Sequence, residues 1–352
     1  MVNKKNKLIF VLFMCIFLLF IYKLVSYDKY KDFKYDYILP NEINFLTFIS
    51  EKTILIESKK NICSYNLENN SIIDTFTTLN EDSVIKKADS FNFGIVWVET
   101  DINSSLNSIY LKYFDSNETI LLDSGVNEII PYIDIEKNVL VYYIADENLE
   151  INCINLLTLK KENIKTYSHD YLEDSLFISK PKTDGSNIIW SETTSIGVSI
   201  YIYSIKNKLL DKMNLDSNIY SPIICKETII AIKENEYFDN ELNIQYASDY
   251  IMEYNCKNKK WKKFEEEIIG EYIGYPRECV SNIFFENNIF YWSSTLTAGN
   301  TLYDLKNNKF ITLTTKNLKY KVSILNVKNN NIYYEFANND EVVKFIYNYR
   351  EK

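Results

Sequence analysis

The sequence is poor in the residues that most catalytic and metal sites need. Its 352 residues include one histidine, seven glycines and five prolines, and arginine occurs only at Arg277 and Arg350. One histidine excludes His-rich metal sites. GxSxG, HExxH and Walker motifs are absent, which argues against serine hydrolases, zinc proteases and P-loop enzymes. His169 precedes Asp170, but adjacent residues on a strand point apart, so we interpret His169 as a loop residue. No catalytic residue, metal or cofactor is expected.

Cysteine is also scarce, and its pattern excludes a framework of disulfides. Beyond the N-terminal segment the number of cysteines is odd, and no CxxC pair exists, so neither a zinc site nor a set of disulfides is expected. We interpret these cysteines as small buried hydrophobic residues. They are Cys63, Cys153, Cys225, Cys256 and Cys279.

The charge balance is acidic. The chain has 39 Lys and Arg against 48 Asp and Glu, a formal net charge of −9, which argues against nucleic acid as a partner. Hydrophobic residues make up 46% and aromatic residues 15%, too much apolar material for a disordered chain. The aromatic residues are mainly tyrosine and phenylalanine, which favour half-buried β-strands.

An apolar run from 8 to 25 predicts one transmembrane helix. It is interrupted only by Lys23, and at 1.5 Å per residue it is about 27 Å long, close to the thickness of a bilayer core. Lysines in the preceding tail, 1–7, place that tail in the cytoplasm and the rest of the chain outside. Leu24 two positions before Ser26 is a poor cleavage signal, so an uncleaved signal anchor is favoured over a cleaved peptide. Residues 26–42 are then a linker with a closing strand, and 43–352 the outer domain.

An internal repeat organises the outer domain. An apolar strand such as 53–57 or 94–99 is followed by a partner strand such as 61–67 or 108–114, and then by a turn rich in Asn, Lys and Asp. A fourth strand follows in several units, as at 71–76 and 119–123. Units of about 45 residues with four strands are typical of propeller blades. Turns of this kind are expected at 68–70, 115–118, 160–163, 206–208 and 257–260.

The repeat predicts an all-β protein, a β-propeller of seven four-stranded blades. The last unit ends on its third strand near Tyr349, so the ring needs a strand from elsewhere, and 33–40 is the natural donor. Closing the ring in this way removes exposed sheet edges. An open β-solenoid and two β-sandwiches are alternatives, and six closed blades with an extra hairpin unit is another.

The repeated phrases resemble the TolB-like, WD-related bacterial propeller repeats. The segments at 130–142, 178–190 and 220–232 carry the resemblance, in which a turn containing Pro, Asp and Gly precedes an apolar strand. Only Asp184–Gly185 keeps the Asp-Gly pair. The resemblance covers 43–349 and implies a propeller fold with a role in protein or surface binding.

The connections between second and third strands suggest a binding face. Acidic residues begin several of them, which would focus a negative potential on a cation or a basic partner. The segment 234–250 is the longest of these connections and is expected to be a loop carrying aromatic residues. The candidate partner-binding residues are Glu99, Glu192, Glu234, Tyr237, Phe238, Asp239 and Tyr246.

Two functions follow from this face. The first, favoured over an enzyme, is a membrane-anchored, extracytoplasmic β-propeller that serves as a protein-binding or scaffolding module. The alternative is a glycan-binding protein, or a glycan hydrolase or lyase, in which Glu99, Glu192 and Glu234 supply a pair of carboxylates. A protein or a cell-wall glycan is therefore the expected partner, in addition to the membrane held through 8–25.

Overall fold

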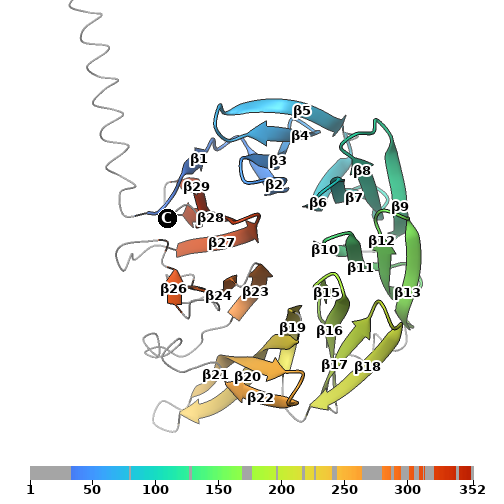
Figure 1. The fold of residues 1–352 in the computed structure, drawn as a ribbon, viewed down its shortest axis with the longest axis vertical. Helices are drawn as coiled ribbons and strands as arrows, with labels where there is room; N and C mark the ends of the chain where they lie inside the picture. Colours follow the sequence, from blue (N-terminus) through green and yellow to red (C-terminus); the bar gives the residue numbers. More distant parts are fainter. Residues whose placement is uncertain are drawn as a thin grey trace, which may run out of the picture.

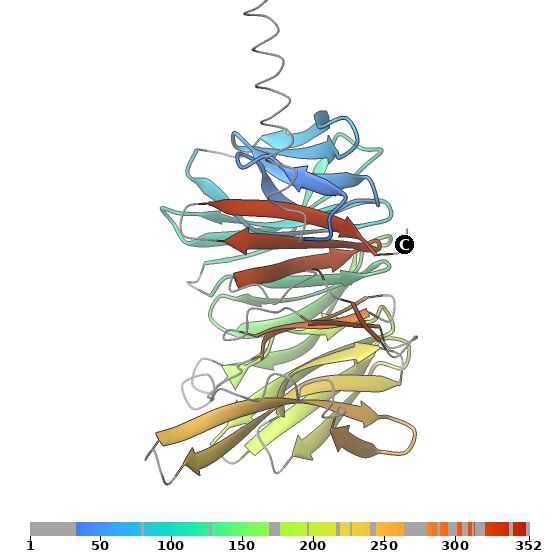
Figure 2. The ribbon, with the colours of Figure 1, turned by 90° about the vertical axis from the view of Figure 1, so that its left-hand side faces the viewer.

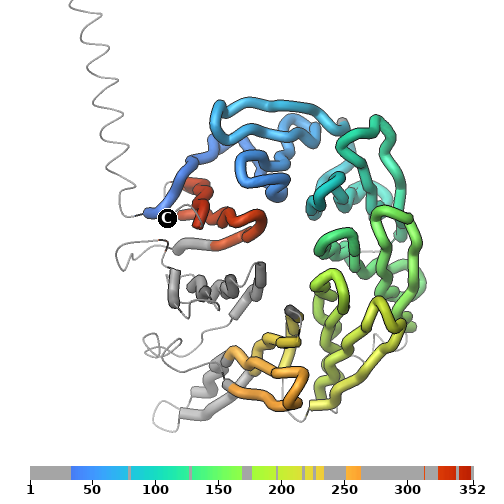
Figure 3. The backbone as a smooth tube through the Cα atoms, in the orientation of Figure 1, coloured from blue at the N-terminus to red at the C-terminus, as the bar shows by residue number. Residues whose placement is uncertain are grey.

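The fold is a ring of antiparallel β-sheets. A computed structural model describes residues 33–349, apart from 79–80, 127–128, 169–176, 196, 216–218, 226, 240–243, 264–279, 287–288, 295–300, 305–308, 312, 314–320 and 338–340. The sheets surround a central axis, with the chain passing from one sheet to the next in order (Figures 1 and 3). This arrangement is a β-propeller, so the all-β prediction is confirmed.

The described residues form seven sheets. In most of them four consecutive strands pair in chain order, and seen from the side the strands cross the thickness of the ring (Figure 2). The first three of these sheets contain β2 (Asn44–Phe48), β3 (Thr53–Ser58), β4 (Asn61–Asn66), β5 (Ser71–Thr78); β6 (Ser83–Phe91), β7 (Gly94–Asp101), β8 (Leu106–Tyr113), β9 (Thr119–Val126); and β10 (Tyr132–Glu136), β11 (Val139–Ala145), β12 (Leu149–Asn155), β13 (Lys160–Tyr167).

The next three sheets follow the same order. One of them has two short strands, β14 and β15, paired to the same neighbour β16. They contain β14 (Phe177–Ile178), β15 (Lys182–Thr183), β16 (Asn187–Thr194), β17 (Gly197–Ser204), β18 (Leu209–Leu215); β19 (Ile219–Cys225), β20 (Thr228–Asp239), β21 (Ile244–Asn255), β22 (Lys260–Lys263); and β23 (Val280–Glu286), β24 (Ile289–Ser294), β25 (Thr301–Asp304), β26 (Lys309–Ile311).

The last sheet joins the two ends of the ring. It contains β27 (Lys321–Lys328), β28 (Asn331–Ala337) and β29 (Val342–Asn348), and its fourth strand is β1 (Tyr37–Leu39), paired to β29 with Ile38 opposite Phe345. The Asp36 carboxylate accepts a bond from the Asn348 N–H at 2.7 Å, and Tyr334 Oη donates to the Lys34 carbonyl at 2.7 Å. This is the pairing predicted for 33–40.

Tight hairpins follow from residues that tolerate left-handed backbone. Asn329 and Asn330 between β27 and β28 have φ of 50° and 64°, as a two-residue type I′ turn requires. The Asn- and Lys-rich turns expected at 68–70, 206–208 and 257–260 are present, but 160–163 begins β13 instead and the turn lies at 156–159. A prediction from composition missed this turn because it contains the apolar residues Leu156 and Leu159.

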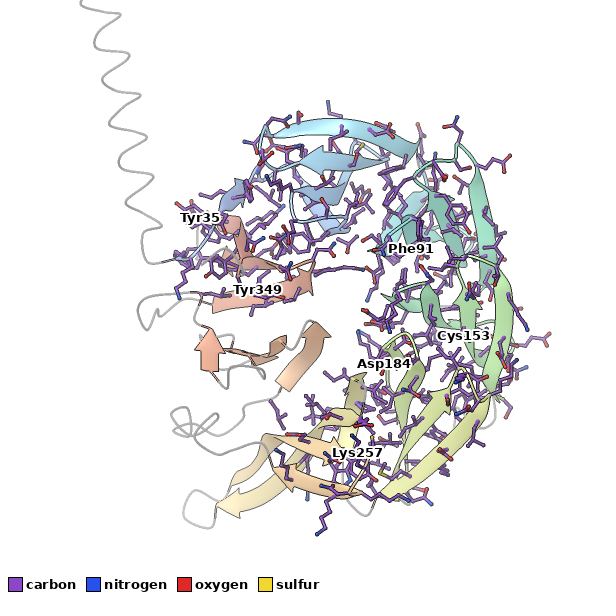
Figure 4. The ribbon with its side chains drawn as sticks, viewed as in Figure 1. Tyr35, Phe91, Cys153, Asp184, Lys257 and Tyr349 are labelled. Carbon is purple, nitrogen blue, oxygen red and sulfur yellow. The ribbon has the colours of Figure 1, made fainter. Side chains whose placement is uncertain are left out.

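The core lies between neighbouring sheets. The second strands β3, β7, β11, β16 and β28 each have a run of three or more buried residues. Trp97 on β7 and Trp190 on β16 stack on the tyrosines paired opposite them, Tyr110 and Tyr201. Burial of such large aromatic side chains is the main favourable term in folding. Cys63 and Cys153 are free and buried, as predicted, whereas Cys256 is free and only half-buried. Figure 4 shows Cys153 within the ring wall.

The predicted membrane span lies outside the described residues, as does His169. Within residues 33–349, as far as they are described, no helix is long and apolar enough to cross a membrane.

Candidate functional site

Exposed apolar side chains lie in the β7–β8 turn and in the β9–β10 connection, at the same end of the sheet β6–β9. The Ile102 N–H donates to the Asp82 carbonyl at 3.0 Å, so the β7–β8 turn touches the β5–β6 connection. Leu106 pairs with Val126, which brings the end of β9 to the same place. The group, which we call the apolar patch, has side chains 36–62% exposed and consists of Ile102, Leu106, Val126, Ile129 and Ile130.

Local geometry holds this patch in place. The Asp101 carboxylate accepts from the N–H groups of Asn103 and Ser104 at 2.8 and 3.0 Å, and these backbone bonds lower the pKa of Asp101 below its usual value. Gly125 allows β9 to approach the next sheet, because a Cβ there would lie 2.5 Å from the Ala145 carbonyl oxygen. The turn after Ala145 therefore lies beside the patch.

Acidic residues surround the apolar patch. Glu81 and Asp82 are exposed before β6, Asp101 is half-buried beside Ile102, and Asp146 and Glu147 are exposed in the β11–β12 turn. An exposed apolar patch with a polar rim is typical of a protein-binding surface. Asp101, Asp146 and Glu147 stand at connections between second and third strands, where acidic residues were expected, whereas the apolar patch itself was not predicted.

Two of the predicted site residues lie inside strands rather than in loops. Glu192 on β16 is 2% exposed, and its carboxylate lies 3.2 Å from Lys165 Nζ, which in turn lies 3.7 Å from the Tyr201 ring centre. Glu99 on β7 is half-buried and accepts from Trp97 Nε1 at 3.4 Å. The sheet β10–β13 separates their two sheets in the ring order, so Glu99 and Glu192 are not a neighbouring carboxylate pair.

The remaining predicted residues lie on the hairpin of β20 and β21. The segment 234–250 was expected to be a loop, but its backbone continues the strands, with Tyr237 paired to Tyr246 and Glu234 to Asp249. In the sequence of β21, Ile244, Tyr246 and Tyr250 share a period of two, which favours a strand over an open loop. Phe238 and Asp239 lie near the end of β20, beside Gln245 and Ile244. Their role in binding remains a prediction.

A second cluster, which was not predicted, lies on the inner strands. Tyr132 and Asp134 on β10 lie with Lys87 on β6 and Lys182 on β15, strands that surround the centre of the ring (Figure 1). Lys182 Nζ donates to Asp134 Oδ1 at 2.9 Å and to Tyr132 Oη. Asp184, in the turn after β15, lies on the same inner side of the ring (Figure 4). The strands β6, β10 and β15 that carry the cluster are tens of positions apart in sequence, so no motif could reveal it.

Within the described part of the chain, no group of three or more His, Cys, Asp and Glu side chains is placed to hold a metal ion.

Comparison with known proteins identifies the fold. No protein-family model and no curated protein matches the sequence. Among solved structures, oligogalacturonate lyase from Vibrio parahaemolyticus is similar with 9% identity and a TM-score of 0.56, over 88% of this chain and 91% of that one. The β-propeller domain of the trilobed protease from Pyrococcus furiosus is similar with 11% identity and a TM-score of 0.54, over 78% and 83%.

These similarities support a propeller and nothing narrower. TolB from Acinetobacter baumannii is also similar, with 10% identity over 78% of this chain and 63% of that one, but its TM-score of 0.42 is too low to carry an argument. The propeller fold shared with the other two structures agrees with the fold that the resemblance of the repeats implied. At these identities the neighbours show fold alone, because one fold supports many functions.

Proposed function

We propose that this protein is a membrane-anchored, extracytoplasmic β-propeller of seven blades that binds a protein partner. The apolar patch with its acidic rim is the observation that carries this proposal. Its five side chains are exposed by 36–62%, although each could be buried by a partner that offers apolar side chains at its centre. The acidic rim favours basic residues at the edge of that partner and faster association with it.

The anchor and the localisation rest on the sequence. The apolar run 8–25 with lysines before it supports insertion with the propeller outside the cytoplasm. The first strand of the ring is β1, in the closing sheet, so only a short linker separates that sheet from the proposed anchor.

The alternative, a glycan-binding or glycan-cleaving propeller, has less support from the described contacts. Glu192 is buried against Lys165, and Glu99 lies on a separate sheet beside Trp97. A glycosidase needs two carboxyl groups about 5–10 Å apart around a bond that substrate can reach. The similarity to oligogalacturonate lyase does not change this, because it shows the fold alone.

The patch can be tested by capture of a partner on membranes that carry the full chain. We expect Ile102→Asp with Leu106→Asp to abolish capture, because two charges would be buried at the centre of the interface. Ile72→Asp with Ile73→Asp is the matched control. Both residues are exposed and lie near the start of β5, at the end of the sheet β2–β5 away from the β5–β6 connection. Capture by the first variant equal to wild type, with an unchanged melting temperature, would exclude the patch as the binding surface.

A further inference from the structure

Three lysine ammonium groups surround one tyrosine ring on the inner strands. The Nζ atoms of Lys87, Lys182 and Lys180 lie 3.8, 5.0 and 5.1 Å from the centre of the Tyr132 ring. They come from β6 and from the segment around β15, on either side of β10. The face of a tyrosine ring attracts a cation at such distances. Three cations at one ring, however, also repel one another, and this is unusual in a chain with a net charge of −9.

One of these ammonium groups is neutralised. Lys182 donates to Asp134 Oδ1 at 2.9 Å, and Asp134 Oδ2 accepts from the Thr183 N–H at 2.9 Å, so both side chains are fixed. Burial acts to lower the pKa of Lys182, but Asp134 and Tyr132 outweigh it and hold that pKa above its usual value. Burial likewise acts to raise the pKa of Asp134, but Lys182 and Lys87 hold it below its usual value. The pair therefore stays ionised.

The other two ammonium groups have no such carboxylate. Among the residues that the structure describes, no Asp or Glu oxygen lies within 4.0 Å of Lys87 Nζ or Lys180 Nζ. Three ammonium groups and one carboxylate leave two positive charges at the cluster. The positive charge also acts on the Tyr132 hydroxyl. Burial acts to raise the pKa of Tyr132, but Lys182 and Lys87 bring that pKa below its usual value.

A backbone irregularity directs Lys87 toward this cluster. The register of β6 against β7 shifts between Ile85 and Lys87, so Lys86 is the extra residue of a β-bulge. A bulge changes which side of the strand the following side chains face. Lys87 is half-buried over the Tyr132 ring, while Lys86 is exposed. Lys180 is exposed as well, so solvent reaches the ammonium groups from that side.

We propose that Lys87, Lys180 and the Tyr132 hydroxyl form a binding site for an oxyanion, the carboxylate or phosphate group of a small solute. Lysine ammonium groups bind such anions through short charge-assisted hydrogen bonds. The Lys182–Asp134 pair holds Tyr132 in position, and an anion between the two unneutralised lysines would offset the excess positive charge. This site lies on the inner strands and uses none of the residues of the apolar patch, so it stands independently of the proposed protein partner.

Calorimetric titration of the full-length protein in detergent tests the site, with inorganic phosphate and citrate as separate probes at low salt. We expect wild type to bind at least one of them, and Lys87→Gln with Lys180→Gln to weaken that binding at least tenfold. Lys160→Gln with Lys206→Gln is the matched control, because it removes the same charge from two exposed lysines outside the cluster. Binding of phosphate alone identifies a phosphate group, and binding of citrate alone a carboxylate.

Two results would overturn the site. One is the absence of binding of either anion to wild type, and the other is an equal loss in the control, which would show a general effect of net charge. If the double variant does not fold, the wild-type protein still gives a readout: a bound anion disfavours tyrosinate, so it must raise the pKa of Tyr132. That shift is measured from tyrosinate absorbance as the difference between wild type and Tyr132→Phe, and its absence at saturating anion rejects the site.

Discussion

Lys328 on β27 donates a hydrogen bond to the Asp89 carboxylate on β6, although 239 residues separate them in the sequence. Lys328 Nζ also donates to the Ser90 carbonyl at 2.6 Å, and Thr47 Oγ1 on β2 donates to the same Asp89 carboxylate at 3.3 Å. The last, first and second sheets of the ring are thus joined at their inner strands. Both charged side chains are mostly buried, so this contact is shielded from salt.

We expect Lys328→Met to lower the free energy of unfolding by about 1.5–3 kcal/mol, because it leaves a mostly buried carboxylate without its ammonium partner. Chemical denaturation of the full chain measures this. Lys52→Met is the control, since the Lys52–Glu68 pair is exposed and such pairs contribute at most about 1 kcal/mol. Equal losses in the two variants would show that the inner contact does not stabilise the ring.

The closing strand gives a second prediction. Leu39 is buried against Tyr333 and Ile346, while its neighbour Ile38 is 40% exposed. Leu39→Ala should therefore destabilise the protein by about 2–5 kcal/mol and promote aggregation, because loss of β1 leaves β29 as an open edge. Ile38→Ala should change the melting temperature little. A melting temperature unaffected by Leu39→Ala would mean that β1 does not hold the ring closed.

Asp134 predicts a dependence of stability on acid pH. Its pKa in the folded protein lies below the ordinary value of 3.8, because the two lysines outweigh the effect of burial. A carboxyl group with a lowered pKa contributes stability that is present above the unfolded pKa and is lost as pH falls through the folded pKa. Melting temperature measured against pH should therefore fall more steeply below pH 3.8 in wild type than in Asp134→Asn. Parallel curves would contradict the prediction.

Substitution of Glu192 and of Glu99 tests whether these carboxylates have a structural or a catalytic role. Glu192→Gln removes the countercharge of half-buried Lys165 and should cost about 1.5–3 kcal/mol of stability, whereas Glu99→Gln should cost less than about 1 kcal/mol. Thermal denaturation of both variants measures this. If Glu192→Gln keeps its stability and instead loses cleavage of a cell-wall glycan, the enzymatic alternative becomes the better hypothesis.

The elements that pattern alone could predict are those with continuous apolar strands. The hairpins predicted at 53–57 with 61–67 and at 94–99 with 108–114 are confirmed as β3–β4 and β7–β8. The joining of 33–40 to the last sheet was inferred from a missing fourth strand, and β1 fills that place. Period-2 patterns of buried side chains contain this information because a strand alternates its faces.

The inner clusters could not be predicted in this way. Register shifts occur on β6 at Lys86 and likewise on β2 and β27, and a bulge leaves no clear mark in composition. Spacing along the chain also does not reveal which side chains meet across the ring, so Lys328 with Asp89 and Lys180 with Tyr132 were invisible. The position of Glu192 was missed for a related reason: β16 continues four residues beyond its last apolar residue, Trp190, so Glu192 lies inside the strand.

The ring is closed by a strand of only three residues, β1, and the short segment from Phe33 that precedes it packs on the same last sheet. Tension applied through the N-terminal segment would therefore load the β1–β29 ladder along the strand axis before it reached any other sheet. A short ladder breaks under less force than the long hairpins elsewhere. Pulling on the N-terminus would thus separate β1 from β29 first, so this pairing is the mechanically weakest contact of the ring.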